Sequence, residues 1–75
     1  MDSFQQCKHV ATKIASLFNQ YRWFNGTEPG LTSDKQLGVL LYAKYNPIEI
    51  IPSSFEGFPI ELIDESKFTI QPNIT

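Results

Sequence analysis

The sequence predicts an α+β domain in which one N-terminal amphipathic helix packs on an antiparallel sheet of three to five strands. Two observations predict this class. Apolar residues recur every three or four positions in residues 3–21, and they alternate with other residues in residues 36–45 and 58–63. The chain has 75 residues, which suits one small domain spanning residues 1–75.

Residues 3–21 carry the helical pattern. At about 100° per residue, the apolar side chains fill one arc of a helical wheel and polar side chains fill the opposite arc. The apolar set is Phe4, Cys7, Val10, Ala11, Ile14, Leu17, Phe18 and Tyr21. Ser3 and Gln6 have the spacing of a capping box, so we expect Ser3 to be the N-cap. We expect Ile14 and Phe18 to be among the most buried residues.

The segment after the helix is expected to form a short strand and then a loop. Residues 21–25 hold three aromatic side chains, which favour extended structure, and Asn25-Gly26 ends the strand. Residues 27–35 are mostly polar and contain Pro29-Gly30, which predicts a loop. Long loops often carry function, so we name Glu28, Asp34 and Lys35 as possible contacts of a partner.

The second half of the chain is expected to supply the remaining strands. Residues 36–45 are apolar on both faces, and we place Leu37, Val39, Leu41 and Ala43 toward the helix. Shorter strands are expected at residues 48–51, 58–63 and 68–71. Gly57 can supply the positive φ angle of a corner before the strand at 58–63.

Composition excludes several classes of site. A single cysteine allows no internal disulfide, and one cysteine with one histidine gives no zinc-ligand spacing. No glycine-rich phosphate loop is present, so we expect no cofactor and no metal. The net charge of −2 argues against a nucleic-acid partner. No signal peptide or membrane-length apolar run is found, which favours a cytoplasmic location and no membrane contact.

We also considered whether the sequence could contain a catalytic site. Cys7 and His9 cannot form a dyad, because two residues apart on a helix they point about 200° away from each other. A minimal acid/base enzyme would have to use Glu61 or Glu65 with His9. The simpler interpretation of these acids is an exposed edge that keeps a strand soluble. We therefore predict that the protein is not an enzyme, and we assign no catalytic residue.

A further alternative concerns single-stranded nucleic acid. Arg22, Trp23 and Phe24 form a run in which aromatic rings adjoin an arginine, the combination on which bases stack. Packing of these rings in the core is the simpler interpretation in a small domain.

Residues 36–62 also carry a resemblance. Ile51-Pro52-Ser53-Ser54-Phe55-Glu56-Gly57-Phe58-Pro59-Ile60-Glu61-Leu62 resembles a corner of the form proline, four residues, G-x-P-hydrophobic-x-hydrophobic. Such corners, preceded by a helix and a strand like Gly38-Val39-Leu40-Leu41-Tyr42, occur in small uncharacterised bacterial α+β proteins. In size the chain is similar to products of mobile gene cassettes, such as integron cassettes. The resemblance implies a bacterial source and brings no functional residue with it.

The function we expect is that of a non-enzymatic interaction module, a homodimer that binds another protein or a small ligand. One helix can cover only one face of the sheet, which leaves Leu40, Tyr42 and Ile63 without cover. With Trp23 or Phe24 they would form the dimer interface. In the alternative, residues 46–57 fold back over this face with Ile48, Ile51 and Phe55, and the protein is a monomer.

Overall fold

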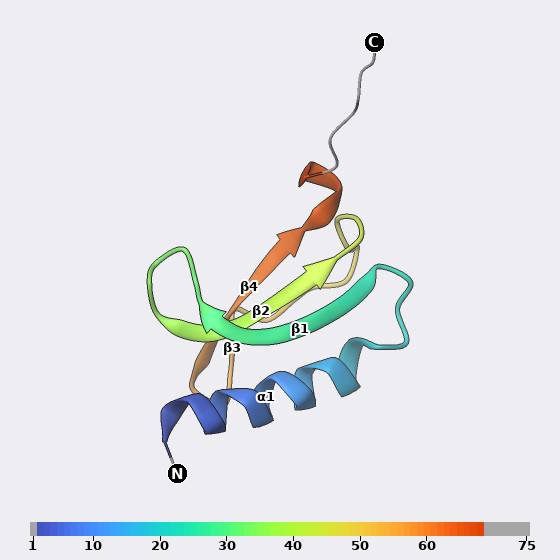
Figure 1. Cartoon of the computed structure of the whole chain (residues 1–75). Helices are drawn as coiled ribbons and strands as arrows, with labels where there is room; N and C mark the ends of the chain where they lie inside the picture. The colour runs from blue at the N-terminus through green and yellow to red at the C-terminus, as the bar shows by residue number, and fades with distance from the viewer. Residues whose placement is uncertain (1, 69–75) are drawn as a thin grey trace.

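The structure is a computed structural model that describes residues 2–68. Helix α1 (Ser3–Phe18) is followed by strands β1 (Phe24–Leu31), β2 (Leu37–Ala43), β3 (Ser54–Phe55) and β4 (Phe58–Asp64), and by a short 3₁₀ helix, η1 (Glu65–Phe68) (Figure 1). The helix packs on one face of the four-stranded sheet, so the α+β class predicted from the sequence is confirmed.

The sheet has the order β1-β2-β4-β3 and is mixed rather than antiparallel throughout. β1 and β2 form an antiparallel hairpin, and β3 pairs antiparallel with β4. The central pair, β2 and β4, is parallel. Parallel neighbours need a connection that crosses from one end of the sheet to the other, and residues 44–53 make that crossing before β3. The prediction of an antiparallel sheet is therefore wrong for its central pair of strands.

The N-cap of helix α1 lies one residue before the expected Ser3. The helix also ends earlier than the sequence pattern indicates. Asp2, not Ser3, is the N-cap, and its carboxylate accepts a 2.8 Å hydrogen bond from the Gln5 backbone N–H. A carboxylate at this position also interacts favourably with the helix dipole. The last helical residue is Phe18, and turns at residues 19–23 lead into β1.

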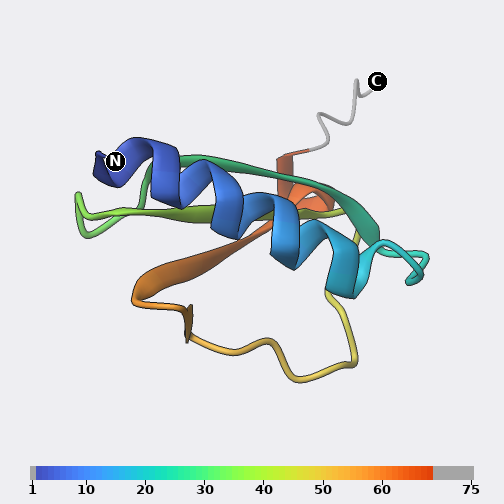
Figure 2. The same ribbon diagram turned by 90° about the horizontal axis from the view of Figure 1, so that it is seen from below.

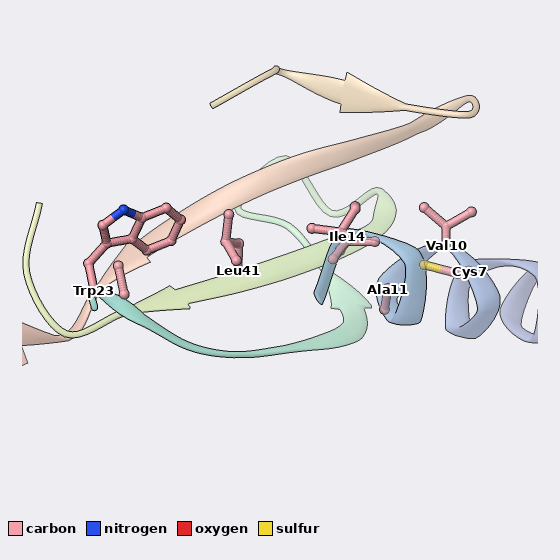
Figure 3. Close-up of a cluster of buried hydrophobic side chains, with 8 residues drawn as sticks. Cys7, Val10, Ala11, Ile14, Trp23 and Leu41 are labelled. Carbon is pink, nitrogen blue, oxygen red and sulfur yellow. The ribbon is translucent and has the colours of Figure 1, made fainter. Parts of the chain in front are cut away.

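The hydrophobic core lies between α1 and the central strands (Figure 3). Its buried members are Cys7, Val10, Ala11, Ile14, Trp23, Val39, Leu41 and Ala43. Ile14 is fully buried, as predicted, but Phe18 is only half-buried because it lies at the margin of the core against the rings of Tyr21 and Trp23. Phe4 and Leu17 are about half exposed, at 48% and 52%, so the buried stripe is narrower than the apolar arc.

Strand β1 contradicts the expected strand at residues 21–25 and the expected loop at residues 27–35. It runs from Phe24 to Leu31 and includes Gly26, Pro29 and Gly30. β1 is an edge strand, hydrogen-bonded on one side only, and an edge tolerates proline and glycine that a central strand excludes. The loop that remains is the short connection from Thr32 to Gln36, where the Thr32 N–H donates to the Gln36 carbonyl at 2.8 Å.

Residues 48–51 form no strand, which corrects another prediction. The crossing segment lies on the same side of the sheet as α1 (Figure 2). Ile51 and Phe55 pack against the core from this segment, and Trp23 Nε1 donates a 2.7 Å hydrogen bond to Glu49 Oε1. The position beside β2 that an extra strand would need is already taken by β4. The expected strand at residues 68–71 lies outside the described residues apart from Phe68, which ends η1.

The corner before β4 is a tight hairpin turn. Glu56 and Gly57 connect Phe55 of β3 to its partner Phe58 of β4, and both turn residues have positive φ angles, 50° and 87°. Two positive φ angles are the requirement of a type I′ turn, whose twist suits a two-residue hairpin. Lys13 on α1 ties this turn to the helix through a 2.9 Å ion pair with Glu56.

Candidate functional site

Two surfaces remain uncovered among the described residues. The first is the open sheet face, which we define as the side of β1, β2 and β4 that faces away from α1. The strand registers place two rows across it: Glu28–Leu40–Glu61, and Gly26–Tyr42–Ile63. Leu40, Tyr42 and Ile63 are half-buried, since neighbouring strands shield them in part and α1 packs on the opposite face; η1 also contacts β2.

Carboxylates flank the apolar centre of the open sheet face. Glu28 and Glu61 lie directly across from Leu40 on the two neighbouring strands. Glu28 Oε2 accepts a 2.7 Å hydrogen bond from the Tyr42 hydroxyl, and Glu61 Oε1 accepts a 2.6 Å bond from the Ser33 N–H. Among residues 2–66, neither Glu28 nor Glu61 has a cation within ion-pair distance.

The negative charge of this face acts on Tyr42. The hydrogen bond to Glu28, the partial burial of the phenol, and the charges of Glu28 and Glu65 together raise the pKa of Tyr42 to about 12. Glu65 reaches this region from the start of η1 and accepts a hydrogen bond from the Asn25 side chain of β1. The open sheet face therefore carries a negative potential around an apolar centre.

A hollow of about 360 Å³ lies beside Glu61, at the end of the sheet near the β1–β2 turn. Five polar residues and three apolar residues line it: Thr32, Ser33, Asp34, Ser53 and Glu61, with Pro59, Ile60 and Leu62. Thr32 is buried, and a Cβ atom at Gly38 would meet both Pro59 and the Thr32 methyl group, so this end of the sheet is tightly packed beneath the hollow. The hollow is suited to a polar or positively charged group.

The second surface is the isoleucine segment, which we define as residues 45–50 of the crossing connection. Ile48 is 95% exposed and Ile50 is 93% exposed, more than any other large apolar side chains of the described residues. Glu49 between them points inward to Trp23, which directs its two neighbours outward. Tyr45 is 48% exposed at the start of the segment.

The structure separates the residues that we expected to form a dimer interface. Leu40, Tyr42 and Ile63 share the open sheet face, but Trp23 is only 3% exposed and belongs to the core. Phe24 also packs against the core. Trp23 stacks on Tyr21 at 5.7 Å between ring centroids, so its face is not free to stack on a base beside Arg22.

The residues of the enzymatic alternative do not come together. His9 lies on α1, where it borders a hollow with Gln6, Val10, Glu56 and Phe58 on the helix side of the sheet. Glu61 lies on the open sheet face, and Glu65 follows β4. The sheet thus separates His9 from Glu61, and proton transfer between them would need a path through the core.

The expected partner loop is also divided. Glu28 lies within β1 on the open sheet face, whereas Asp34 and Lys35 lie in the β1–β2 turn, with Lys35 at a φ angle of 64°. Sequence reasoning missed Ile48 and Ile50 as exposed residues because it assigned them to a strand. Asn46-Pro47 before them and Pro52 after them were the available signal, since proline on both sides favours an irregular segment.

Cys7 fits a structural role. Its thiol is fully buried, donates to the Gly38 carbonyl at 3.1 Å, and has a pKa that burial raises above the ordinary value. A thiol whose pKa is raised forms the nucleophilic thiolate less readily. Within residues 2–68, no three side chains of the metal-binding types form a group that could hold a metal ion, and no helix is long and apolar enough to span a membrane.

Comparison with protein-family models, with curated proteins and with solved structures gives no match to this chain. The two surfaces are therefore the basis on which function can be argued.

Proposed function

We propose that the protein is a non-enzymatic interaction module that forms a homodimer through the isoleucine segment. The observation that carries this proposal is the nearly complete exposure of Ile48 and Ile50. Burying one isoleucine side chain contributes about 1.5–3 kcal/mol, and a two-fold contact would bury these residues of both copies at once.

The backbone of the segment supports the same contact. Within the described residues, the backbone groups of residues 46–52 make no hydrogen bond to another backbone group. The segment is irregular, with bends at Ile48 and Glu49, and its unpaired backbone groups can bond to a second copy. The hydrogen bond between Trp23 and Glu49 holds the segment in place, which lowers the entropic cost of pairing.

The open sheet face is less suited to a two-fold contact than the sequence suggested. An isologous interface would bring Glu28 and Glu61 of one copy close to the same carboxylates of the other. Like charges that lose water in an interface repel each other, and no cation of residues 2–66 lies within ion-pair distance of these two. We therefore assign the homodimer to the isoleucine segment.

Sedimentation velocity tests this function with one variant and one matched control. The variant replaces Ile48 and Ile50 with serine, and the control replaces Leu31, a 66% exposed residue at the end of β1, with serine. We expect the wild type and Leu31→Ser to sediment as dimers at micromolar concentration and the double variant as a monomer. A monomeric wild type, or a double variant that stays dimeric, would contradict the proposal.

A further inference from the structure

We propose that the open sheet face binds an extended cationic segment of a partner protein, in which arginine or lysine and apolar residues share one face, as in the pattern Arg-x-Leu-x-Arg. This surface is distinct from the isoleucine segment, so the inference goes beyond the proposed homodimer and can fail or succeed independently of it.

The centre of the open sheet face is apolar. Leu40 and Tyr42 project from the central strand, and Ile63 lies directly across from Tyr42 on β4. The crossing segment lies on the helix side, so it does not fold back over this face. Gly26 and Gly30 on β1 have no side chains that would project from this face, and Leu40 lies close to Gly30. Because few side chains project here, an extended chain can come close to the strands.

The open sheet face also carries negative charge. Glu28 and Glu61 stand on either side of Leu40, and Asp34 borders the hollow next to Glu61. Among residues 2–66, no cation lies within ion-pair distance of Glu28 or Glu61, so a bound arginine or lysine would bring an opposite charge to both carboxylates. This sign of charge disfavours nucleic acid and a second copy of the same face, and it selects a cationic occupant.

The spacing of the carboxylates suits an extended chain. Neighbouring strands lie about 4.8 Å apart, so Glu28 on β1 and Glu61 on β4 flank Leu40 at about 10 Å from each other. Residues two apart on one face of an extended chain are about 6.6–6.8 Å apart, which is also the spacing of Leu40 and Tyr42 along β2. An extended partner that crosses the strands can therefore set an apolar side chain over Leu40, while cationic side chains two residues before and after it reach Glu28 and Glu61.

Arginine fits this surface better than lysine. Its planar guanidinium makes paired hydrogen bonds to a carboxylate and stacks on an aromatic ring. Glu28 and Tyr42 offer both features within one hydrogen-bonded pair, and the hollow at Glu61 and Asp34 offers room for a second guanidinium.

Titration calorimetry tests the inference with a synthetic peptide in which arginine and leucine take turns at every second position and serine lies between them. The variants are Glu28→Gln and Glu61→Gln, and the control is Glu56→Gln, which changes the net charge equally on the helix side of the molecule. We expect saturable binding that weakens about tenfold in each open-face variant, because each removes one charged partner of a cationic side chain. We expect Glu56→Gln to bind as the wild type does, and the same peptide with lysine in place of arginine to bind more weakly.

Three outcomes would overturn the inference. The peptide could fail to bind, or all three variants could weaken binding equally, which would indicate general attraction to an acidic protein. In the third outcome, Leu40→Glu would convert a wild-type dimer into a monomer, which would identify a second copy as the occupant of this face. Circular dichroism of each variant checks that the fold is retained.

Discussion

The Tyr42 hydroxyl donates a 2.7 Å hydrogen bond to Glu28 Oε2 and so links β2 to β1 on the open sheet face. The two residues are not direct neighbours in the register, since Glu28 lies opposite Leu40 and Tyr42 lies opposite Gly26. The bond therefore runs diagonally between strands, and it leaves the second oxygen of Glu28 able to accept from a partner.

This bond predicts the titration of Tyr42. Its pKa is raised from 10.0 to about 12, because ionisation would break the hydrogen bond and place a phenolate beside Glu28. The bond stabilises the fold fully below pH 10, and this contribution is lost as the pH rises through about 12. The difference in ultraviolet titration between the wild type and Tyr42→Phe should show a midpoint near 12. In Glu28→Gln that midpoint should move toward 10, and an unchanged midpoint would contradict the assignment.

A second prediction concerns the core. Ile14→Ala should lower the free energy of unfolding by about 2–5 kcal/mol, because the side chain is fully buried and a cavity would remain. Leu17→Ala on the same helix, at a side chain that is 52% exposed, should have a much smaller effect. Urea unfolding measures both changes. Equal effects would mean that the helix is rotated on the sheet.

The bond between Trp23 and Glu49 gives a third prediction. Glu49→Ala removes the acceptor of a buried indole N–H and should cost about 1–3 kcal/mol. Glu49→Gln keeps an oxygen acceptor and should cost less. Tryptophan fluorescence should shift to longer wavelength in Glu49→Ala only, as the crossing segment loosens and water reaches the ring. The same spectrum in all three proteins would argue against this anchor.

The hairpin turn gives a fourth prediction. A Cβ atom at Gly57 would meet no other atom within 4 Å, so the cost of Gly57→Ala comes from its φ angle of 87°. We expect a loss of about 1–2 kcal/mol in the free energy of unfolding. Gly57→Asn should cost less, because asparagine adopts positive φ more readily than alanine. A larger loss in the asparagine variant would refute this explanation.

The elements that could be predicted from the sequence are those with a regular pattern. α1 and β2 follow from the spacing of Ile14 and its neighbours and from the alternation around Val39 and Leu41, both of which report burial directly. β1 could not be predicted in the same way. Pro29 is disfavoured in strands in general, and only its place at the edge of the sheet makes it acceptable.

The candidate surfaces were only partly predictable for a similar reason. The open face of Leu40, Tyr42 and Ile63 follows from alternation, but its flanking charge depends on which strands lie beside β2. A parallel partner such as β4 is set by the path of the crossing connection, which local patterns do not report. Ile48 looks like a strand residue by propensity and is exposed because no neighbouring strand is available to it.

A concentration series of amide spectra, recorded by nuclear magnetic resonance, tests the central claim most directly. If the protein pairs through the isoleucine segment, the amide signals of Ile48, Glu49 and Ile50 shift or broaden as the concentration rises, while those of Leu40 and Ile63 stay constant. Spectra that do not change with concentration, or changes confined to the open sheet face, would contradict the account.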